Sequence, residues 1–328
     1  MMDCIPAQPE HIPLIREAFH QERETRRNHY VAYLADPAIA DFHRDRIIQI
    51  LQNPANDSSL RLILENGRLM ALAGLARSPW HSEHYGIPFY KINPFFAFAS
   101  EPNQLPPILG AIRDTLCNKP GSVYAMRLEA RQTALVYHMG RFGFAHVGVS
   151  LRMVMEPLPK PSVDNRSGRT YDFINIRAFK TDEIPVLEKI AERSHTHNHF
   201  FREVRFSKER TQALFVEWIR KCTSGWAQNV FVAESKGKVV GFSILLINRS
   251  LAPYIGKKIG IVDFIVVDRS AQGTGIGGCL LNASLAWFQT QAEVVELRTM
   301  DDNIEAVRFY EKHGFRVLTV DHHYHYWT

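Results

Sequence analysis

The stretch AQGTGIGGCLL at residues 271–281 follows closely on the apolar run IVDFIVV at residues 261–267. Four glycines lie within residues 273–278, and good helix formers come after them. The pattern predicts a buried strand that turns abruptly into a helix. The first N–H groups of a helix lack intrahelical acceptors and carry partial positive charge, so they can bind phosphate. Glycine at such a turn permits positive φ and a close approach of the backbone to the anion.

Two common phosphate-binding motifs fit this run poorly. A Walker loop ends in Lys followed by Ser or Thr, and no such pair follows the glycines. A dinucleotide fingerprint opens a βαβ unit and is followed by an acidic residue at the end of the next strand. The late position of residues 271–281 in the chain argues against that motif.

The run VDRSAQGTGIG at residues 267–277 resembles motif A of the GNAT acyltransferases. In that family the pattern (Gln/Arg)-x-x-Gly-x-(Gly/Ala) holds the pyrophosphate of acetyl-CoA through its backbone amides. The run NIEAVRFYEKHGF at residues 303–315 resembles motif B of the same family. The two motifs stand in the family's order, and the resemblance covers residues 172–328. The motif A positions that it assigns to acetyl-CoA are Gln272, Gly273, Thr274, Gly275, Ile276 and Gly277.

The resemblance implies roles for other residues of the two motifs. In the family the two central strands diverge, so backbone N–H groups near Ile265, Val266 and Val267 bind pantetheine and the thioester oxygen. Tyr310 stands where the family has the tyrosine that protonates the CoA thiolate. Asn303 and Ala306 stand where the family contacts the cofactor.

Each of these side chains also has a structural alternative. Tyr310 can be a helix tyrosine that packs its ring, because buried tyrosines are common. Asn303 can be the N-cap of the helix that follows it, and both roles can hold together. Asp263, on the strand before motif A, is a candidate general base; it can instead pair with Lys257 or Lys258 while a water chain removes the proton.

Two further segments resemble the dTDP-fucosamine acetyltransferases, which acetylate a 4-amino-sugar on a nucleotide carrier. These are residues 197–225 with the tail HYHYW, and SPWHSEHYGIPFYKI at residues 78–92. We expect His199, Arg202 and Tyr324 to line the acceptor pocket rather than to hold a metal. Arg202 can meet a nucleotide phosphate there, or it can be a surface arginine.

The sequence therefore predicts an N-acetyltransferase that moves an acetyl group from acetyl-CoA directly to a primary amine, and a nucleotide-linked amino-sugar is the best-supported acceptor. An aminoglycoside, a polyamine or a protein amine is the alternative acceptor. An acyl-CoA-binding sensor without turnover is a third interpretation, which the motif B tyrosine Tyr310 argues against.

We expect no metal cofactor. His195, His197 and His199 alternate, and His322, His323 and His325 lie near the C-terminus, but no cysteine or carboxylate motif accompanies either group. The four cysteines are far apart and are expected to be free thiols in a reducing compartment.

Domain organisation is predicted from a linker and a repeated element order. EPLPKPSVDNRSGRT at residues 156–170 has prolines and polar residues but almost nothing to bury. We expect a first domain at 1–156, a linker at 157–170 and a catalytic domain at 171–328. The second half is predicted as β-α-α-β-β-β-α-β-α-β, and the first half repeats that order more weakly. The fold class is therefore α/β (α+β), with two GNAT-like domains that each have a mixed central sheet flanked by helices.

The first domain is predicted to be a degenerate copy that supports the acceptor site. Gly143–Phe144 and Gly314–Phe315 mark corresponding points of the two halves. Counting back from Gly143 by the motif B spacing places Met139 at the tyrosine position and Gln132 at the asparagine position.

Composition limits the remaining function classes. The chain has 328 residues, 45% hydrophobic and 22% charged, with a net charge of +5. Lys and Arg are scattered, so we expect no nucleic-acid partner. No apolar run approaches the roughly 20 residues that cross a membrane, and no signal peptide is evident, so a cytoplasmic location is expected. A small-molecule amine is the expected partner, and a homodimer is compatible with the sequence.

Overall fold

The computed structural model describes residues 2–26, 36–53, 58–98, 102–156, 158, 173–194 and 197–328. The chain packs as two compact units. Unit 1 comprises Met1–Ser150 together with Thr319–Thr328, and unit 2 comprises Leu151–Leu318. The strands β6 (Ala145–Met155) and β12 (Arg316–Trp327) therefore contribute residues to both units.

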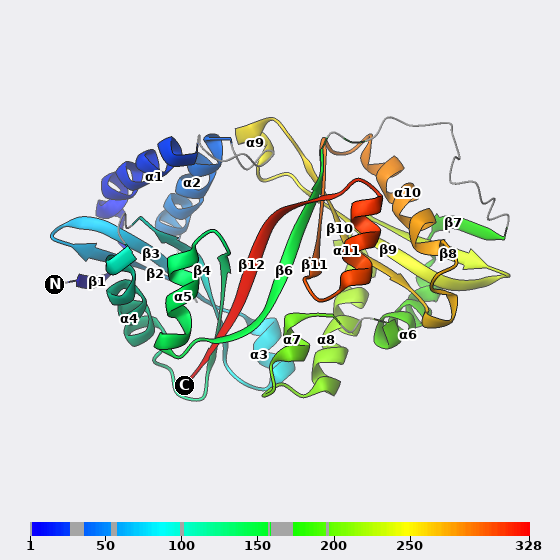
Figure 1. Ribbon diagram of the computed structural model, residues 1–328, viewed down its shortest axis with the longest axis horizontal. Helices are drawn as coiled ribbons and strands as arrows, with labels where there is room; N and C mark the ends of the chain where they lie inside the picture. Colours follow the sequence, from blue (N-terminus) through cyan, green and yellow to red (C-terminus); the bar gives the residue numbers. More distant parts are fainter. Residues whose placement is uncertain are drawn as a thin grey trace. The chain divides into compact units, whose positions relative to one another are not determined.

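Unit 1 is a mixed sheet with helices on both faces (Figure 1). Its strand order is β1-β2-β3-β4-β5-β12-β6, in which β4 and β5 are parallel. Its other strands are β1 (Met2–Pro6), β2 (Ser58–Glu65), β3 (Arg68–Arg77), β4 (Phe89–Ala97) and β5 (Val123–Glu129). Its helices are η1 (Pro9–His11), α1 (Ile12–Arg26), α2 (Ala38–Gln52), α3 (Pro79–Tyr85), η3 (Pro102–Gln104), α4 (Leu105–Leu116), α5 (Thr133–Met139) and η4 (Gly140–Phe142).

The core of unit 1 lies in two layers, one on each face of the sheet. Leu62 of β2 packs with Phe19 and the other apolar residues of α1 and α2. Its neighbour Ile63 packs with Ile108 and the other apolar residues of α4. Alternation along the strand thus buries consecutive residues on opposite faces.

Unit 2 has the same architecture (Figure 1). Its strand order is β6-β11-β10-β9-β8-β7, in which β10 and β11 are parallel. Its other strands are β7 (Ile174–Ala178), β8 (Asn229–Ser235), β9 (Lys238–Asn248), β10 (Ile259–Val267) and β11 (Val294–Met300). Its helices are η5 (Thr181–Glu183), α6 (Ile184–Ser194), α7 (His199–Arg202), α8 (Lys208–Lys221), the π-turn η6 (Cys222–Trp226), α9 (Ala252–Ile255), η7 (Arg269–Ala271), α10 (Ile276–Phe288) and α11 (Ile304–Lys312).

Corresponding points of the two units share backbone detail. Gly143 and Gly314 have φ of 82° and 90°. The N–H of Phe144 donates to the carbonyl of Met139 at 3.2 Å, and the N–H of Phe315 donates to that of Tyr310 at 3.0 Å. Met139 therefore occupies in unit 1 the position that Tyr310 occupies in unit 2. The predicted fold class, two mixed sheets flanked by helices, is confirmed.

The structure differs from the sequence prediction in several elements. The helices α3, α7 and α9 and the strand β1 were not predicted. The C-terminal run, predicted as a strand pair or as one long strand, is one continuous strand, β12. The last residues of β12 belong to unit 1, where they pair with β5, although the predicted catalytic domain contained them. The predicted linker at 157–170 lies outside the described residues except for Leu158.

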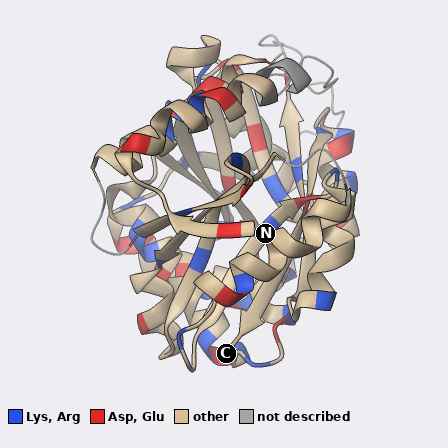
Figure 2. Ribbon diagram, turned by 90° about the vertical axis from the view of Figure 1, so that its left-hand side faces the viewer, with Lys and Arg blue, Asp and Glu red and all other residues tan. Residues whose placement is uncertain are grey.

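The sequence also predicted that Lys and Arg are scattered along the chain and that no apolar run is long enough to cross a membrane. In the view of Figure 2, Lys and Arg are interspersed with Asp and Glu along the ribbon. Among the helices of the described ranges, none combines the length and the hydropathy that a membrane span requires.

Candidate active site

The strands β10 and β11 diverge in the middle of the unit 2 sheet. Their parallel pairing runs only from Ile259 opposite Val294 to Val262 opposite Leu297. On its other side β10 stays paired with β9 as far as Val267. Beyond Val262, the edge of β10 that faces β11 is therefore open in the described part of unit 2.

The direction of the β10 amides follows from one hydrogen bond. The N–H of Asp268 donates to Val240 O on the β9 side at 2.8 Å. Because N–H directions alternate along a strand, the N–H of Val266 also faces β9. The N–H groups of Ile265 and Val267 consequently face the gap between β10 and β11. The resemblance had assigned the amides of Ile265, Val266 and Val267 to the cofactor. The direction of the N–H groups favours Ile265 and Val267 for this contact.

Asp263 lies at a β-bulge at the point of divergence. The register between β10 and β9 shifts between Val262 and Phe264. Val262 packs in the apolar cluster with α10, whereas Phe264 packs in the cluster with α6 and α8. The bulge places Asp263 on the α8 side as well, where its Oδ2 accepts a hydrogen bond of 2.7 Å from the indole N–H of Trp218.

The environment of Asp263 changes its acidity. Desolvation raises the pKa of the Asp263 carboxyl, and the hydrogen bond from Trp218 offsets part of that rise. Neither Lys257 nor Lys258, the alternative partners, pairs with the Asp263 carboxylate. The ammonium group of Lys257 contacts Glu156, and the backbone N–H of Lys258 donates to Glu293. The sequence gave no sign of Trp218, which is 45 positions away from Asp263.

The glycine run forms the turn that the sequence predicts. Gly273 and Gly275 have φ of 76° and 89°, and α10 begins at Ile276 with Gly275 as its N-cap. Thr274 Oγ1 donates to Ala271 O at 2.6 Å, and Gln272 Nε2 donates to Val267 O at 3.0 Å. The amides of residues 273–278 have no acceptor among the described residues, so six N–H groups are available to an anion.

Tyr310 lies on α11, packed against the apolar cluster of α10 and β10. Its ring meets the rings of Phe309 and Phe315 edge to face, with centroids 5.1 and 5.8 Å away. Its hydroxyl makes no hydrogen bond with any described residue. Burial raises the pKa of Tyr310 to about 12, so the phenol is protonated at neutral pH.

Asn303 and Ala306 stand at the start of α11. The Asn303 side chain accepts a hydrogen bond from the N–H of Ala306 at 3.3 Å, as an N-cap does. This cap occupies the amide oxygen and leaves the NH₂ group of Asn303 for other contacts.

Of the three predicted acceptor residues, His199 and Arg202 lie on α7 of unit 2, and Tyr324 lies on β12 in unit 1. Arg202 Nη2 forms ion pairs with Asp301, at 3.5 Å, and with Asp302. The ring of His199 lies against that of Phe200, 4.2 Å between centroids. Tyr324 belongs to unit 1, is 4% exposed and lies in the core beside α5, where its hydroxyl donates to Val136 O at 3.4 Å. That is the placement of a core residue, so it gives no support to an acceptor role for Tyr324.

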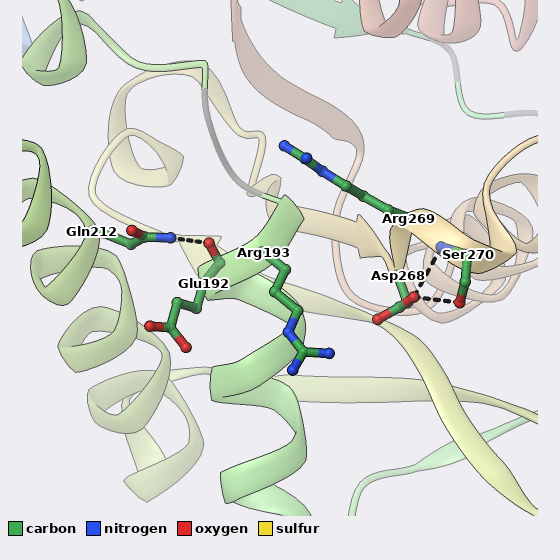
Figure 3. Close-up of a pocket in the computed structure, with 6 residues that line it drawn as sticks. All are labelled: Glu192, Arg193, Gln212, Asp268, Arg269 and Ser270. Carbon is green, nitrogen blue, oxygen red and sulfur yellow. Dashed lines mark hydrogen bonds between the residues drawn. The ribbon is translucent and has the colours of Figure 1, made fainter.

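A hollow of about 730 Å³ lies on unit 2 where the glycine loop begins (Figure 3). The carboxylate of Asp268 accepts from the Ser270 hydroxyl at 2.5 Å and from the Ser270 N–H at 2.9 Å, and these contacts, the hydroxyl first, lower the pKa of Asp268. The guanidinium of Arg193 points toward Asp268, and Gln212 donates to Glu192 O (Figure 3). The residues that line the hollow are Glu192, Arg193, Gln212, Asp268, Arg269 and Ser270.

Among the described residues, no group of three or more His, Cys, Asp or Glu side chains is placed to hold a metal ion. His195 of the alternating histidines lies outside these residues. All four cysteines are free thiols.

Known proteins resemble the chain in sequence. The family model described as Acetyltransferase (GNAT) family matches residues 190–315. The spore coat polysaccharide biosynthesis protein SpsD of Bacillus subtilis is 25% identical over 55% of this chain and 58% of its own length. A mycothiol acetyltransferase of Sanguibacter keddieii is 38% identical over 29% of this chain and 30% of its own length. An N-alpha-acetyltransferase of Sulfurisphaera tokodaii is 29% identical over 49% of this chain and 89% of its own length. The match to the first two relatives thus spans less than two thirds of each.

Two solved structures share the fold over nearly the whole chain. A GCN5-related N-acetyltransferase from Sphaerobacter thermophilus has a TM-score of 0.58 at 16% identity, covering 99% of this chain and 95% of its own. A tandem GNAT protein from the clavulanic acid biosynthesis pathway has a TM-score of 0.53 at 10% identity, covering 99% and 98%. Residues 190–315, which hold the diverging strands, the glycine loop and Tyr310, are the part of the chain that matches the model of the GNAT family of acetyltransferases.

Proposed function

We propose that unit 2 transfers an acetyl group from acetyl-CoA to a primary amine. The observation that carries this proposal is the divergence of β10 and β11 beyond Val262. Asp263 lies on the α8 face of the sheet at that point, and Tyr310 lies on the α10 and α11 face. A thioester in the gap would have a base on one side and an acid on the other.

Acetyl-CoA is proposed to bind along the open edge of β10 and the start of α10. The free amides of residues 273–278 suit its pyrophosphate, because a helix N-terminus favours negative charge. The N–H groups of Ile265 and Val267 suit pantetheine and the thioester oxygen. The NH₂ group of Asn303 suits a further contact with the cofactor near Ala306.

The proposed reaction is a direct transfer. The amine nitrogen attacks the thioester carbon, and negative charge develops on the carbonyl oxygen, where backbone N–H donors stabilise it. The C–N bond forms, the C–S bond breaks, and the sulfur leaves as a thiolate. Asp263, directly or through water, takes the proton from nitrogen, and Tyr310 gives its proton to sulfur. Exchange with solvent then returns both groups to their starting states.

The high pKa of Tyr310 is compatible with this role. An ordinary thiol has a pKa of about 8.5 and would accept a proton poorly from such a phenol in water. Desolvation raises thiol pKa values too, as it does for Cys222 in the same unit, to about 12. If desolvation raises the pKa of the CoA thiol in the same way, the gap between the pKa values of phenol and thiol narrows, which favours proton transfer from Tyr310.

The acceptor is proposed to be an amino-sugar carried on a nucleotide. Two observations support this class: the resemblance of residues 197–225 to amino-sugar acetyltransferases, and the name of the SpsD relative, which refers to polysaccharide biosynthesis. A peptide N-terminus is the second candidate, because the Sulfurisphaera tokodaii relative, matched over 89% of its length, is an N-alpha-acetyltransferase.

A thiol-release assay with a panel of acceptors tests the acceptor class. The panel contains dTDP-4-amino-4,6-dideoxyhexose, the free amino-sugar, a short peptide with a free N-terminus and a polyamine. We expect the nucleotide-linked sugar to give the highest kcat/KM. A higher kcat/KM for the peptide would replace the sugar proposal, and no thiol release with any amine would contradict the acetyl-transfer proposal itself.

A further inference from the structure

An exposed aromatic side chain lies close to the candidate base of unit 2. Trp226 ends the π-turn η6 and is 53% exposed, whereas Cys222 and Thr223 of the same turn are buried. The ring of Trp226 meets that of Trp218 at a steep angle, with centroids 6.4 Å apart. Trp218 in turn donates the hydrogen bond of 2.7 Å to Asp263 Oδ2. These two contacts together place the centre of the Trp226 ring within about 12 Å of Asp263 Oδ2.

The turn holds Trp226 in place without packing its ring into the core. The N–H of Ala227, which follows it, donates to Cys222 O at 3.1 Å. Gly225, which precedes it, has a φ of 107°, and the hydroxyl of Ser224 donates to a carbonyl of α8 at 2.7 Å. Local hydrogen bonds thus fix the backbone while the indole stays at the surface. A π-turn with an exposed side chain of this kind is frequent at functional sites.

A lysine adds positive charge beside the exposed indole. Lys221 Nζ lies 4.8 Å from the centre of the Trp226 ring. No described carboxylate forms an ion pair with Lys221, not even Glu217, one turn earlier on α8. The neighbouring Arg220, in contrast, is paired with Glu188 at 2.9 Å. The charge of Lys221 is therefore available to an anionic ligand that contacts Trp226.

Trp218, Lys221 and Trp226, here called the tryptophan platform, lie on the side of the sheet from which an acceptor would approach. Asp263 faces α8, whereas Tyr310 lies on the opposite face with α10 and α11. In the proposed reaction Asp263 takes the proton from the amine, and acetyl-CoA binds along β10 and the start of α10. The rest of an acceptor whose amine reaches Asp263 would therefore extend on the α8 side, where the platform lies.

A nucleotide combines the two chemical groups that this platform suits. Its base is a planar ring that stacks on an indole, and its phosphates are anions that pair with an ammonium group. We propose that the tryptophan platform binds the nucleotide carrier of the acceptor, with the base on Trp226 and a phosphate beside Lys221. The proposal rests on the proposed function and goes beyond it, because it names the residues that recognise the carrier. A peptide N-terminus offers neither a base nor a phosphate to these side chains.

Calorimetric titration of the full-length protein with dTDP, which carries the base and the phosphates but no amine, tests this proposal. We expect one dTDP per chain. Trp226→Ala should weaken binding at least about tenfold, the usual scale for one lost base–aromatic stack. Trp226→Phe keeps a ring and should retain most of the affinity. Lys221→Gln should weaken binding about threefold at low salt and less as salt is added, because salt screens charged contacts.

Two matched controls change similar side chains elsewhere. Tyr137→Ala removes a ring of unit 1 that is 71% exposed and contacts one neighbouring ring, that of His138. Lys238→Gln removes an exposed charge at the start of β9 in unit 2. Both should leave the dTDP affinity within about twofold, as surface changes away from a site usually do.

Three results of these titrations would overturn the proposal. The first is no binding of dTDP by the wild-type protein. The second is a dTDP affinity that stays unchanged in Trp226→Ala, or that falls equally in Tyr137→Ala. The third is an equal loss of affinity for CoA and for dTDP in Trp226→Ala, because the platform would then belong to the cofactor site.

The thiol-release assay distinguishes failure of the platform from failure of the proposed function. Trp226→Ala should raise KM for the dTDP-linked amino-sugar at similar kcat, because a stack on the carrier is equally strong in the ground state and the transition state. The kcat/KM for the free amino-sugar should stay unchanged. Trp226-dependent binding of dTDP without any thiol release would contradict only the proposed acetyl transfer. Thiol release that requires the nucleotide but not Trp226 would contradict only the platform.

Discussion

The indole nitrogen of Trp218 donates a hydrogen bond of 2.7 Å to Oδ2 of Asp263. This bond joins α8 to the bulge in β10 where the two central strands diverge. It also opposes the desolvation that raises the pKa of Asp263. Trp218 is therefore the residue that limits how basic the Asp263 carboxylate becomes.

Replacement of Trp218 by Phe should change the pH dependence of the reaction. A base must be ionised to take a proton, and loss of the Trp218 hydrogen bond raises the pKa of Asp263 further. The acid-side inflection of kcat/KM should therefore move to higher pH. The control is Trp226→Phe, since Trp226 is exposed and makes no bond to Asp263. An inflection that stays in place in Trp218→Phe would contradict the assignment of Asp263 as the base.

Replacement of Asp263 by Asn should separate activity from stability. Because the folded-state pKa of Asp263 is raised, its ionisation costs stability as the pH rises through that pKa. Asn carries no charge and keeps an oxygen that can accept from Trp218. At neutral pH we expect an equal or higher melting temperature, together with a fall in kcat of about 10²–10⁴-fold. Full activity at unchanged stability would assign proton removal to water alone.

Gly275→Ala should weaken acetyl-CoA binding. Gly275 has a φ of 89°, and an alanine there costs roughly 1–2 kcal/mol of strain, which a shift of the loop can relieve. Such a shift moves the amides that precede α10, so KM for acetyl-CoA should rise. The matched control is Gly121→Ala in unit 1, where φ is 67° and the added carbon meets nothing within 4 Å. Gly121→Ala should lose a similar amount of stability but keep the wild-type KM for acetyl-CoA. Equal KM values for acetyl-CoA in the two variants would argue against the glycine loop as the cofactor site.

Much of the fold was predictable because its signals are local. Asn66 and Gly67 both have positive φ at the tip of the β2–β3 hairpin, as a tight turn of that sequence requires. Ser207 accepts from the N–H of Arg210 at 3.1 Å and caps α8, as a serine directly before a helical run commonly does. The helix α3 was missed although its signals are present: Pro79 at the first position and Gly86, with a φ of 71°, at its end.

Only the parts of the candidate site that lie within motif A or motif B could be predicted from the sequence. The glycine turn and the place of Tyr310 on its helix follow from the spacing within motifs A and B. The bulge at Asp263 left no trace in the sequence, because IVDFIVV has the same apolar pattern with or without a register shift. Asp263 pairs with Trp218, and the last residues of β12 belong to unit 1. Both features depend on contacts between segments that are far apart in the sequence, and local sequence patterns carry no information about such contacts.

Thiol release from acetyl-CoA, compared between the wild-type protein and Tyr310→Phe, tests the central claim most directly. Phenylalanine keeps the ring contacts with Phe309 and Phe315, and the lost hydroxyl has no hydrogen-bond partner among the described residues, so the fold should be retained. We predict rapid, amine-dependent thiol release by the wild type and a loss of about 10²-fold in kcat in the variant, at similar affinity for acetyl-CoA. Equal kcat values for the two proteins would contradict Tyr310 as the group that protonates the leaving thiolate.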